Sequence, residues 1–406
     1  MTNRLNHSEP LQQAIAQAIK ASDRQQITFA EFMALALYHP HGYYSSSDRI
    51  IGPQGDFVTS PHMGHDFGQL LAEQFADMWA QLGKPEPFTL VEMGAGQGLV
   101  AADVLEHLRS HYLSCFESLH YIIVERSSAL RAQQQQRLAH WQKSVALSWK
   151  RLEEIAEGAV VGCAFSNELV DAFPVHWVEW HGELTEMWGS ADNGRLIPVL
   201  GELSTPELSA YFERIGIEFS QHYANGYRTE VNLAALDWIK QVAKILAKGY
   251  LLTIDYGYTA QRYYSPARRE GTLQCYYRHA YHSDPLVRVG QQDITAHVEF
   301  TSLEKVGNSV GLNTMGFTQQ GLFLMALGLG DRLTRLSQPQ REQPATGQTI
   351  QAVMMRREAL QQLISPMGFG NFGVLIQAKG LTQTEIAKPL KGLTIPSMMS
   401  LSKQRD

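Results

Sequence analysis

The feature that most constrains this chain is a glycine-rich turn in the stretch LVEMGAGQGLVAADVLEHL. Apolar residues at Phe88–Met93 predict a strand before the turn, and Gly98–Ser110 predicts a helix after it. Gly94, Gly96 and Gly98 let the backbone turn tightly and let a ligand approach the main chain closely. The first turn of such a helix presents free amide hydrogens to that ligand. The stretch therefore predicts a strand–turn–helix unit with a ligand bound at the turn.

The chain around this unit alternates between strand and helix patterns. Further strands are predicted at Tyr121–Glu125, Val145–Trp149, Ala159–Phe165, Lys248–Tyr256 and Val374–Lys379. A helix is predicted at Ser127–Gln142, with a serine as its N-cap and with glutamines at 133–136 that only solvate its surface. Strands that alternate with helices indicate an α/β fold built on a mostly parallel, doubly wound sheet.

Other segments depart from this alternation. Short helices are predicted at 8–21, 28–38 and 66–81, and later ones at 294–310 and 349–364. The stretch VHWVEWHGELTEMW, within 175–200, predicts an inserted β-hairpin, and 207–247 predicts two helices. We therefore expect five parts: an N-terminal cap and lid (1–85), the first part of the core (86–174), the inserted hairpin and helices (175–247), the second part of the core (248–380) and a C-terminal tail (381–406).

Composition narrows the class of protein. A formal net charge of -6 argues against a nucleic-acid binder and leaves open a cationic small molecule or a basic protein segment as partner. Three scattered cysteines, Cys115, Cys163 and Cys275, indicate a reduced, cytoplasmic protein. The most apolar stretch, Gly321–Gly330, is too short to span a bilayer, so no membrane insertion is expected. The close histidine pairs lack cysteine partners, so we expect no metal site.

Two carboxylates near the glycine turn bear on the ligand. Glu92 would repel a pyrophosphate but suits the cationic amino-acid end of S-adenosyl-L-methionine. The spacing is GxGxG, and Leu99 stands where a dinucleotide fold carries its third glycine. Glu125 ends the next strand, where an acidic residue hydrogen-bonds ribose hydroxyls in nucleoside-binding sheets. A ligand-free turn and an ordinary polar strand end are the alternatives, and the pair together favours S-adenosyl-L-methionine.

Six short motifs carry a resemblance to a known family. In chain order they are GDFVTSP, EMGAGQG, SNELVDAFPV, DYGY, GTLQCYYRH and QDITAHVEFTSL. Together they resemble the MidA family of class I methyltransferases, related to the mitochondrial arginine methyltransferase that assists assembly of respiratory complex I. The resemblance extends from about residue 28 to about residue 380. It implies a Rossmann-like fold that binds S-adenosyl-L-methionine and methylates an arginine of a protein client, with a respiratory complex subunit as one such client.

The resemblance also implies site residues. On the cofactor side these are Glu92, Gly94, Gly96, Gly98, Glu125, Ser166 and Asn167. On the acceptor side they are Asn167, Glu168 and Asp171. Glu168 would grip the guanidinium, with Asp171 or Asp255 as the second choice, although either aspartate could simply start a helix or end a strand.

Three questions stay open at the level of sequence. GDFVTSP is either a lid over the cofactor or a plain turn. Tyr276, Tyr277 and Tyr281 either belong to the core or line an acceptor groove. The chain could also methylate a different acceptor, or could be a non-catalytic assembly chaperone that retains the fold.

Overall fold

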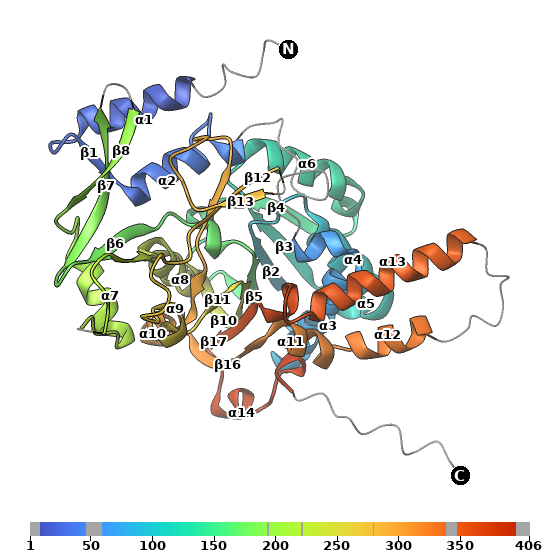
Figure 1. The fold of residues 1–406 in the computed structure, drawn as a ribbon. Helices are drawn as coiled ribbons and strands as arrows, with labels where there is room; N and C mark the ends of the chain where they lie inside the picture. The colour runs from blue at the N-terminus through green and yellow to red at the C-terminus, as the bar shows by residue number, and fades with distance from the viewer. Residues whose placement is uncertain are drawn as a thin grey trace.

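A seven-stranded sheet runs through the middle of the molecule in the order β16-β17-β10-β5-β2-β3-β4 (Figure 1). The computed structural model describes residues 9–45, 59–192, 195–220, 222–278, 280–337 and 347–394. The strands are β2 (Phe88–Met93), β3 (Leu119–Val124), β4 (Ala146–Lys150), β5 (Val160–Asn167), β10 (Leu246–Asp255), β16 (Asn313–Gln319) and β17 (Gly373–Lys379). β4, β3, β2, β5 and β10 are parallel, and β17 runs antiparallel between β10 and β16. The expected doubly wound, mostly parallel sheet is confirmed.

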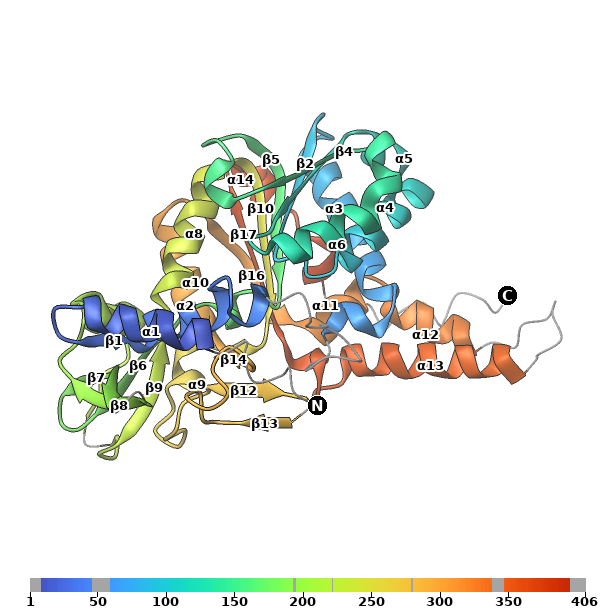
Figure 2. The same ribbon diagram turned by 90° about the horizontal axis from the view of Figure 1, so that it is seen from above.

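Helices cover both faces of this sheet (Figures 1 and 2). One face carries α3 (Asp66–Gln81), α4 (Leu99–His111), α5 (Leu113–Glu117), α6 (Ser128–Leu138), α11 (Gln320–Ala326), α12 (Leu329–Ser337) and α13 (Gly347–Ile364). The other carries α7 (Glu207–Ile215), α8 (Leu233–Ile245) and α10 (Phe300–Ser309). The predicted helices at 8–21, 28–38, 66–81 and 349–364 are confirmed within two residues at their ends.

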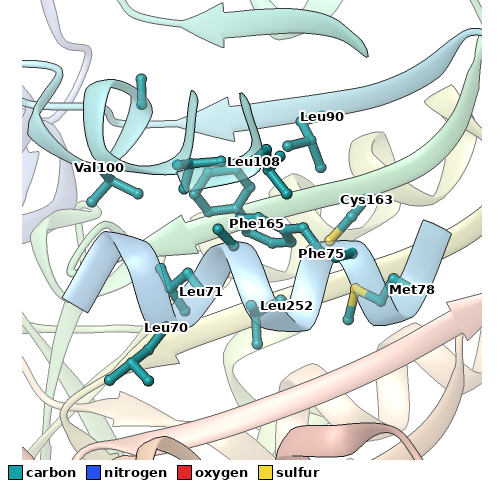
Figure 3. Close-up of a cluster of buried hydrophobic side chains, with 14 of the residues drawn as sticks. Leu70, Leu71, Phe75, Met78, Leu90, Val100, Leu108, Cys163, Phe165 and Leu252 are labelled. Carbon is teal, nitrogen blue, oxygen red and sulfur yellow. The ribbon is translucent and has the colours of Figure 1, made fainter. Parts of the chain in front are cut away.

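A cluster of buried apolar side chains lies beneath α3 (Figure 3). The α3 side chains that pack into it are Leu70, Leu71, Phe75 and Met78. They meet Leu90, Phe165 and Leu252 from three adjacent strands. The rings of Phe75 and Phe165 are 4.8 Å apart between centroids. Each fully buried side chain of this size contributes roughly 1.5–3 kcal/mol, so α3 is held to the sheet mainly by apolar burial.

The predicted hairpin is confirmed, and it forms part of a second, five-stranded sheet. Residues 175–200 contain β6 (His176–Trp180), β7 (Leu184–Asp192) and most of β8 (Arg195–Gly201), and they pair with β1 (Gln26–Thr28) and β9 (Tyr227–Val231). The prediction of two helices over 207–247 is correct for α7 and α8 but misses β9 between them. β9 and β1 form strands because distant partners bind them, and local periodicity does not reveal distant partners.

The N-terminal helices pack on this second sheet. They are α1 (Glu9–Ala21) and α2 (Phe29–Tyr38). Thr28 and Glu31 form a capping box at the start of α2, and the Phe29 ring lies 5.1 Å from the Trp177 ring. This packing fixes the end of α2, and the residues that follow it, near the carboxyl ends of the main strands.

The remaining short elements surround the same edge. They are β11 (Gly257–Tyr258), α9 (Ala260–Tyr263), β12 (Gln274–Tyr277), β13 (Ala280–His282), β14 (Asp293–Thr295) and β15 (Val298–Glu299). Helix α14 (Gln383–Ile386) lies instead at the amino end of β10, where Glu385 pairs with Lys248 at 2.7 Å. The predicted helix at 294–310 begins only at Phe300, because residues 293–295 pair with β12 and 298–299 pair with β11. The three cysteines are buried and unpaired. Across the described segments, no helix is long and apolar enough to cross a membrane.

Leu71→Ala tests the role of α3 in stability. Leu71 is fully buried, and removing its side chain should lower the free energy of unfolding by about 2–5 kcal/mol. Leu322→Ala is the matched control, because Leu322 is 55% exposed and should change stability by less than about 1 kcal/mol. Urea unfolding followed by circular dichroism measures both, and equal losses would contradict this account of the core.

Candidate functional site

A cavity of about 370 Å³ opens at the carboxyl ends of β2, β3 and β5. Its walls include Tyr38, Tyr44, His62, Glu92, Gly94, Gly96, Gln97, Glu125, Asn167, Glu168 and Leu169. β2 lies between β3 and β5 in the sheet. After β2 the chain forms β3 and β4 on one side of it, and then crosses to form β5 on the other side. Open α/β sheets bind ligands at this kind of reversal of strand order. We call this space the first cavity.

The glycine turn has the backbone form that a close ligand requires. Gly94, Gly96 and Gly98 have φ values of 74°, 52° and 75°, a region that other residues rarely adopt. A Cβ on Gly96 would meet no protein atom within 4 Å, whereas one on Gly98 would contact Gln134 at 3.4 Å. Gly94 and Gly96 line the first cavity, and Gly98 instead begins α4 behind it. The main chain at Gly96 is therefore open to a ligand.

Glu92 is a buried acidic residue with no ion-pair partner in the described chain. Its side chain is only 4% exposed and accepts a 2.7 Å hydrogen bond from the Tyr121 hydroxyl. No Lys, Arg or His in the described chain lies within ion-pair distance of it. Burial raises the pKa of Glu92 to about 7, and the nearby Glu125 adds to the rise while the Tyr121 hydrogen bond opposes it. A cationic ligand in the first cavity would favour the ionised form of Glu92.

Glu125 is held by its own helix and by a buried glutamine. Its two oxygens accept hydrogen bonds from the Ser127 amide at 2.8 Å and from the Gln134 side chain at 3.1 Å. Gln134 also donates to the carbonyl of Gly96 at 2.8 Å and is fully buried. The expectation that glutamines 133–136 only solvate the helix is therefore wrong for Gln134. The sequence did carry a signal for the burial of Gln134. It lies four residues after Leu130 and four before Leu138, so all three share one face of the helix.

Glu168 follows β5 in a left-handed conformation, with φ at 51°. A non-glycine residue pays roughly 1–3 kcal/mol for such a conformation, and surrounding contacts must hold it. Its amide donates to the Ile254 carbonyl at 2.9 Å. Its Oε1 accepts from the Ser60 amide at 3.0 Å and from the Asn167 side chain at 3.1 Å. Burial, with a smaller contribution from Asp171, raises the pKa of Glu168 to about 8.

Asp255 has a structural role rather than a place in a cavity. It is fully buried, and its Oδ2 accepts from the amides of Leu169, Val170 and Asp171 at 3.2, 2.9 and 3.4 Å. Its Oδ1 accepts from the Tyr256 amide. These bonds hold the segment after Glu168, so Asp255 supports the site and does not line it.

Asp171 lies in a second cavity of about 540 Å³. Its Oδ2 accepts a 2.6 Å hydrogen bond from Tyr256, and its Oδ1 is buried without any hydrogen-bond partner in the described chain. Burial raises its pKa to about 6. The other side chains of this cavity include Tyr44, Glu168, Tyr258, Tyr276, Asp293, His297 and Phe372. Acidic groups beside aromatic faces suit a cation.

The two cavities meet at Glu168 and Tyr44, which line both. The Tyr44 hydroxyl donates to Asp293 at 2.9 Å, and the Tyr38 hydroxyl donates to the Ala172 carbonyl at 2.6 Å. Neither tyrosine was predicted as a site residue, because they reach the site from the end of α2 and from the turn that follows it. Tyr276 does line the second cavity, whereas Tyr281 is 73% exposed and lines neither.

The structure places most of the predicted residues at these two cavities. Ser166 is fully buried and, like Gly98, lines neither of them. Residues 55–58 of the GDFVTSP motif lie outside the described residues, and its last residues, Thr59 and Pro61, line the first cavity. In the described segments, no group of three His, Cys, Asp or Glu side chains could hold a metal ion.

Known proteins resemble most of the chain in sequence. Residues 70–318 match a family model described as "Putative S-adenosyl-L-methionine-dependent methyltransferase". The chain is 31% identical over 340 residues to "Protein arginine methyltransferase NDUFAF7 homolog, mitochondrial" of Drosophila melanogaster, covering 76% of this chain and 73% of that protein. It is 30% identical over 358 residues to "Protein arginine methyltransferase NDUFAF7, mitochondrial" of Mus musculus, covering 81% and 76%.

Solved structures resemble it as well. A Burkholderia thailandensis protein crystallised with S-adenosyl-homocysteine has a TM-score of 0.81 and 31% identity, with 95% of each chain covered. A native crystal structure from the same organism has a TM-score of 0.79 at 31% identity, covering 96% of this chain and 95% of that one. S-adenosyl-homocysteine is what remains of S-adenosyl-L-methionine after its methyl group leaves, so the predicted cofactor is confirmed.

The predicted cytoplasmic location is corrected by these comparisons. The names of the Drosophila and mouse relatives place those proteins in mitochondria. The reasoning from cysteines fails here because a reduced, unpaired set of thiols does not distinguish one reducing compartment from another.

Gly96→Ala tests the glycine turn. The added methyl group would point into open cavity space, so S-adenosyl-homocysteine should bind at least about tenfold more weakly, a loss of about 1.4 kcal/mol. Gly158→Ala is the control, because Gly158 also has a positive φ (65°) and open space around it but precedes β5 at the opposite end of the strand. Calorimetry should show weakened binding only for Gly96→Ala. Unchanged affinity would remove this turn from the cofactor site.

Proposed function

This chain belongs to the family of S-adenosyl-L-methionine-dependent methyltransferases that it matches, and from this we propose that it methylates a guanidinium nitrogen of arginine in a protein client. The expected class I methyltransferase fold, with its seven-stranded sheet, is confirmed. The observation that carries the proposal is the second cavity, which is lined by the carboxylates of Glu168 and Asp171 together with aromatic side chains and lies directly beside the first cavity. The names of the relatives support arginine as the acceptor.

The residues of the first cavity fit the cofactor. When bound, the cofactor supplies an electrophilic methyl group on a sulfonium ion. We assign Glu92 to its ammonium group, because this buried acid has no cation of its own. We assign Glu125 to the ribose hydroxyls, since both of its oxygens are already oriented by donors and retain acceptor capacity. Gly96 leaves open space at the main chain, and Gly94 also lines this cavity.

Glu168 and Asp171 are assigned to the acceptor. A guanidinium stays protonated in proteins, and its delocalised charge makes it a poor nucleophile. A carboxylate that accepts two of its N–H groups localises that charge and leaves the third nitrogen free to react. Ser60 and Asn167 hold Oε1 of Glu168, while its Oε2 has no hydrogen bond in the described chain. Tyr256 holds Oδ2 of Asp171 and leaves Oδ1 unpaired.

The same two carboxylates can take the proton that the reaction releases. The acceptor nitrogen must lose one proton for each methyl group it gains. Burial places the pKa of Glu168 at about 8 and that of Asp171 at about 6, near the pH at which proteins work. A base with a pKa in this range both ionises and accepts protons there. Glu168 and Asp171 can therefore both bind the cationic acceptor and accept the proton that it loses.

The client is found by comparing cells that contain this chain with cells that lack it. Mass spectrometry of the two proteomes should reveal an arginine methyl mark that disappears with the chain, and subunits of respiratory complexes are the first clients to inspect. A lost mark on another residue or on a small molecule would favour a different acceptor. Cofactor binding without any lost mark would favour an assembly chaperone that retains the fold.

Glu168→Gln tests the guanidinium grip. The change keeps the size of the side chain and removes its charge. Methyl transfer to the client should fall by about a hundredfold or more, while affinity for S-adenosyl-homocysteine stays near that of the unsubstituted protein. Glu106→Gln, at a half-exposed position on α4, should leave both unchanged. Undiminished transfer by Glu168→Gln would exclude Glu168 as the grip.

The acceptor's apparent affinity should depend on pH in a defined direction. Burial holds the pKa of Glu168 at about 8, well above its ordinary value, so below pH 8 the free site is mostly protonated. A cation requires the ionised form and must displace that proton. KM for the acceptor should therefore fall as the pH rises from about 6 to 8, by up to tenfold per unit, and then level off. A KM that is flat over this range in the unsubstituted protein would contradict the assignment, and Glu168→Gln should remove most of the slope.

A further inference from the structure

The second cavity is acidic inside but has two arginines at its edge. The guanidinium carbons of Arg262 and Arg268 lie 4.5 and 4.3 Å from the centroid of the Tyr258 ring. Tyr258 is itself a wall of that cavity. Both guanidinium groups therefore contact a side chain that lines the cavity, although neither arginine lines it. We call Arg262 and Arg268, together with the ring they contact, the Tyr258 rim.

Neither arginine has an ion-pair partner among the described residues. No carboxylate in the described segments lies within 4.0 Å of Arg262 or Arg268. Arg228, on the neighbouring β9, has Glu179 at 2.8 Å and Glu270 at 3.9 Å. The chain as a whole carries a net charge of -6, so carboxylates are not scarce. The absence of ion-pair partners for Arg262 and Arg268 in the described segments is therefore specific to this part of the surface.

The rim is attached to well-ordered structure. Tyr258 belongs to β11, which pairs with β15, and its ring stacks on His297 at 5.2 Å. Arg262 lies on α9, directly after that strand. Glu230 anchors the segment after Arg268. Its carboxylate accepts hydrogen bonds from the amide and hydroxyl of Thr272 and from the amide of Leu273. Arg262 and Arg268 therefore start from fixed positions, which limits the entropy lost when they bind a partner.

The charge of the rim reaches into the cavity. Burial lowers the pKa of His297 to about 4, and Arg268 lowers it further in the same direction. His297 is a wall of the second cavity and its Nδ1 is buried without a hydrogen-bond partner. A second positive charge on the client close to this rim would be repelled, whereas a negative one would be attracted.

We propose that the Tyr258 rim selects clients in which the acceptor arginine has an acidic residue close by in the sequence. This inference rests on the proposed function, because it takes the second cavity as the acceptor site. Asp171 and Glu168 would take the cationic side chain, and Arg262 and Arg268 would take the neighbouring carboxylate through paired N–H groups. A flanking lysine or arginine would face two guanidinium groups that have no ion-pair partner in the described chain, which supplies the rejection that specificity requires.

The test measures binding separately from catalysis. The probes are three short fluorescein-labelled peptides with one central arginine, flanked on both sides by glutamate, by glutamine or by lysine. Fluorescence anisotropy gives their dissociation constants for the full chain in the presence of S-adenosyl-homocysteine at 0.1 M salt. We expect the glutamate peptide to bind at least about tenfold more tightly than the lysine peptide, with the glutamine peptide between them. Equal binding of the three peptides, or no binding, would overturn the inference.

Charge reversal at the rim provides the sharper comparison. The double variant Arg262→Glu/Arg268→Glu should invert the order, so that the lysine peptide binds best. The milder pair Arg262→Gln/Arg268→Gln should abolish the preference without inverting it, which separates lost charge from a misfolded loop. Arg109→Glu is the matched control, since Arg109 also lies over an aromatic ring but in the last turn of α4, away from both cavities. A loss of preference in Arg109→Glu would show that net charge alone decides binding.

Methyl transfer is then measured on the same peptides. Preferential binding of the glutamate peptide without transfer to any arginine would support the rim and contradict the proposed methylation. Transfer to all three peptides at one rate, with equal binding, would support the methylation and contradict the rim. The two ideas therefore fail on different readouts.

Discussion

The site depends on one buried carboxylate that lines neither cavity, that of Asp255. It ends β10, is fully buried, and accepts hydrogen bonds from three successive amides after β5 and from the amide of Tyr256. An unpaired buried amide costs about 1–3 kcal/mol, so these bonds strongly favour this path of the chain over others. The path keeps Glu168 in its left-handed conformation and directs Asp171 toward the second cavity. Both cavities therefore rely on Asp255 although neither contains it.

The chain treats its acidic residues in two distinct ways. Glu73 is partly buried, yet hydrogen bonds from His107, Lys391 and Tyr112 outweigh that burial and lower its pKa to about 2. Glu92 and Glu168 are also removed from water, but they have no cation, and their pKa values rise to about 7 and 8. Unpaired acids of this kind cost stability and persist where function needs them. Burial also raises the pKa of Glu230 and of Glu299 outside the cavities, but backbone amides donate to the carboxylates of both, which gives them a structural role.

The sequence predicted those parts of the fold and site that local pattern determines. The strand Phe88–Met93, the glycine turn and the helix after it are all present, because apolar period and glycine conformation act over a few residues. The hairpin β6–β7 was predicted, but the rest of the second sheet was beyond reach, since β1 and β9 become strands only through partners far away in the chain. Tyr38 and Tyr44 were missed for the same reason. The positive φ of Glu168 is imposed by its neighbours and leaves no trace in residue type.

The shared wall of the two cavities has a consequence for their chemistry. Glu168 borders both spaces, and one of its oxygens is held by Ser60, which comes from the turn beside the first cavity, and by Asn167. A group that enters the first cavity and moves this turn must also change the support of the carboxylate that faces the second. Binding free energies that act through one shared group are coupled in both directions. Cofactor and acceptor should accordingly influence each other's affinity through Glu168, and the strain at this residue makes its conformation responsive to the contacts on either side.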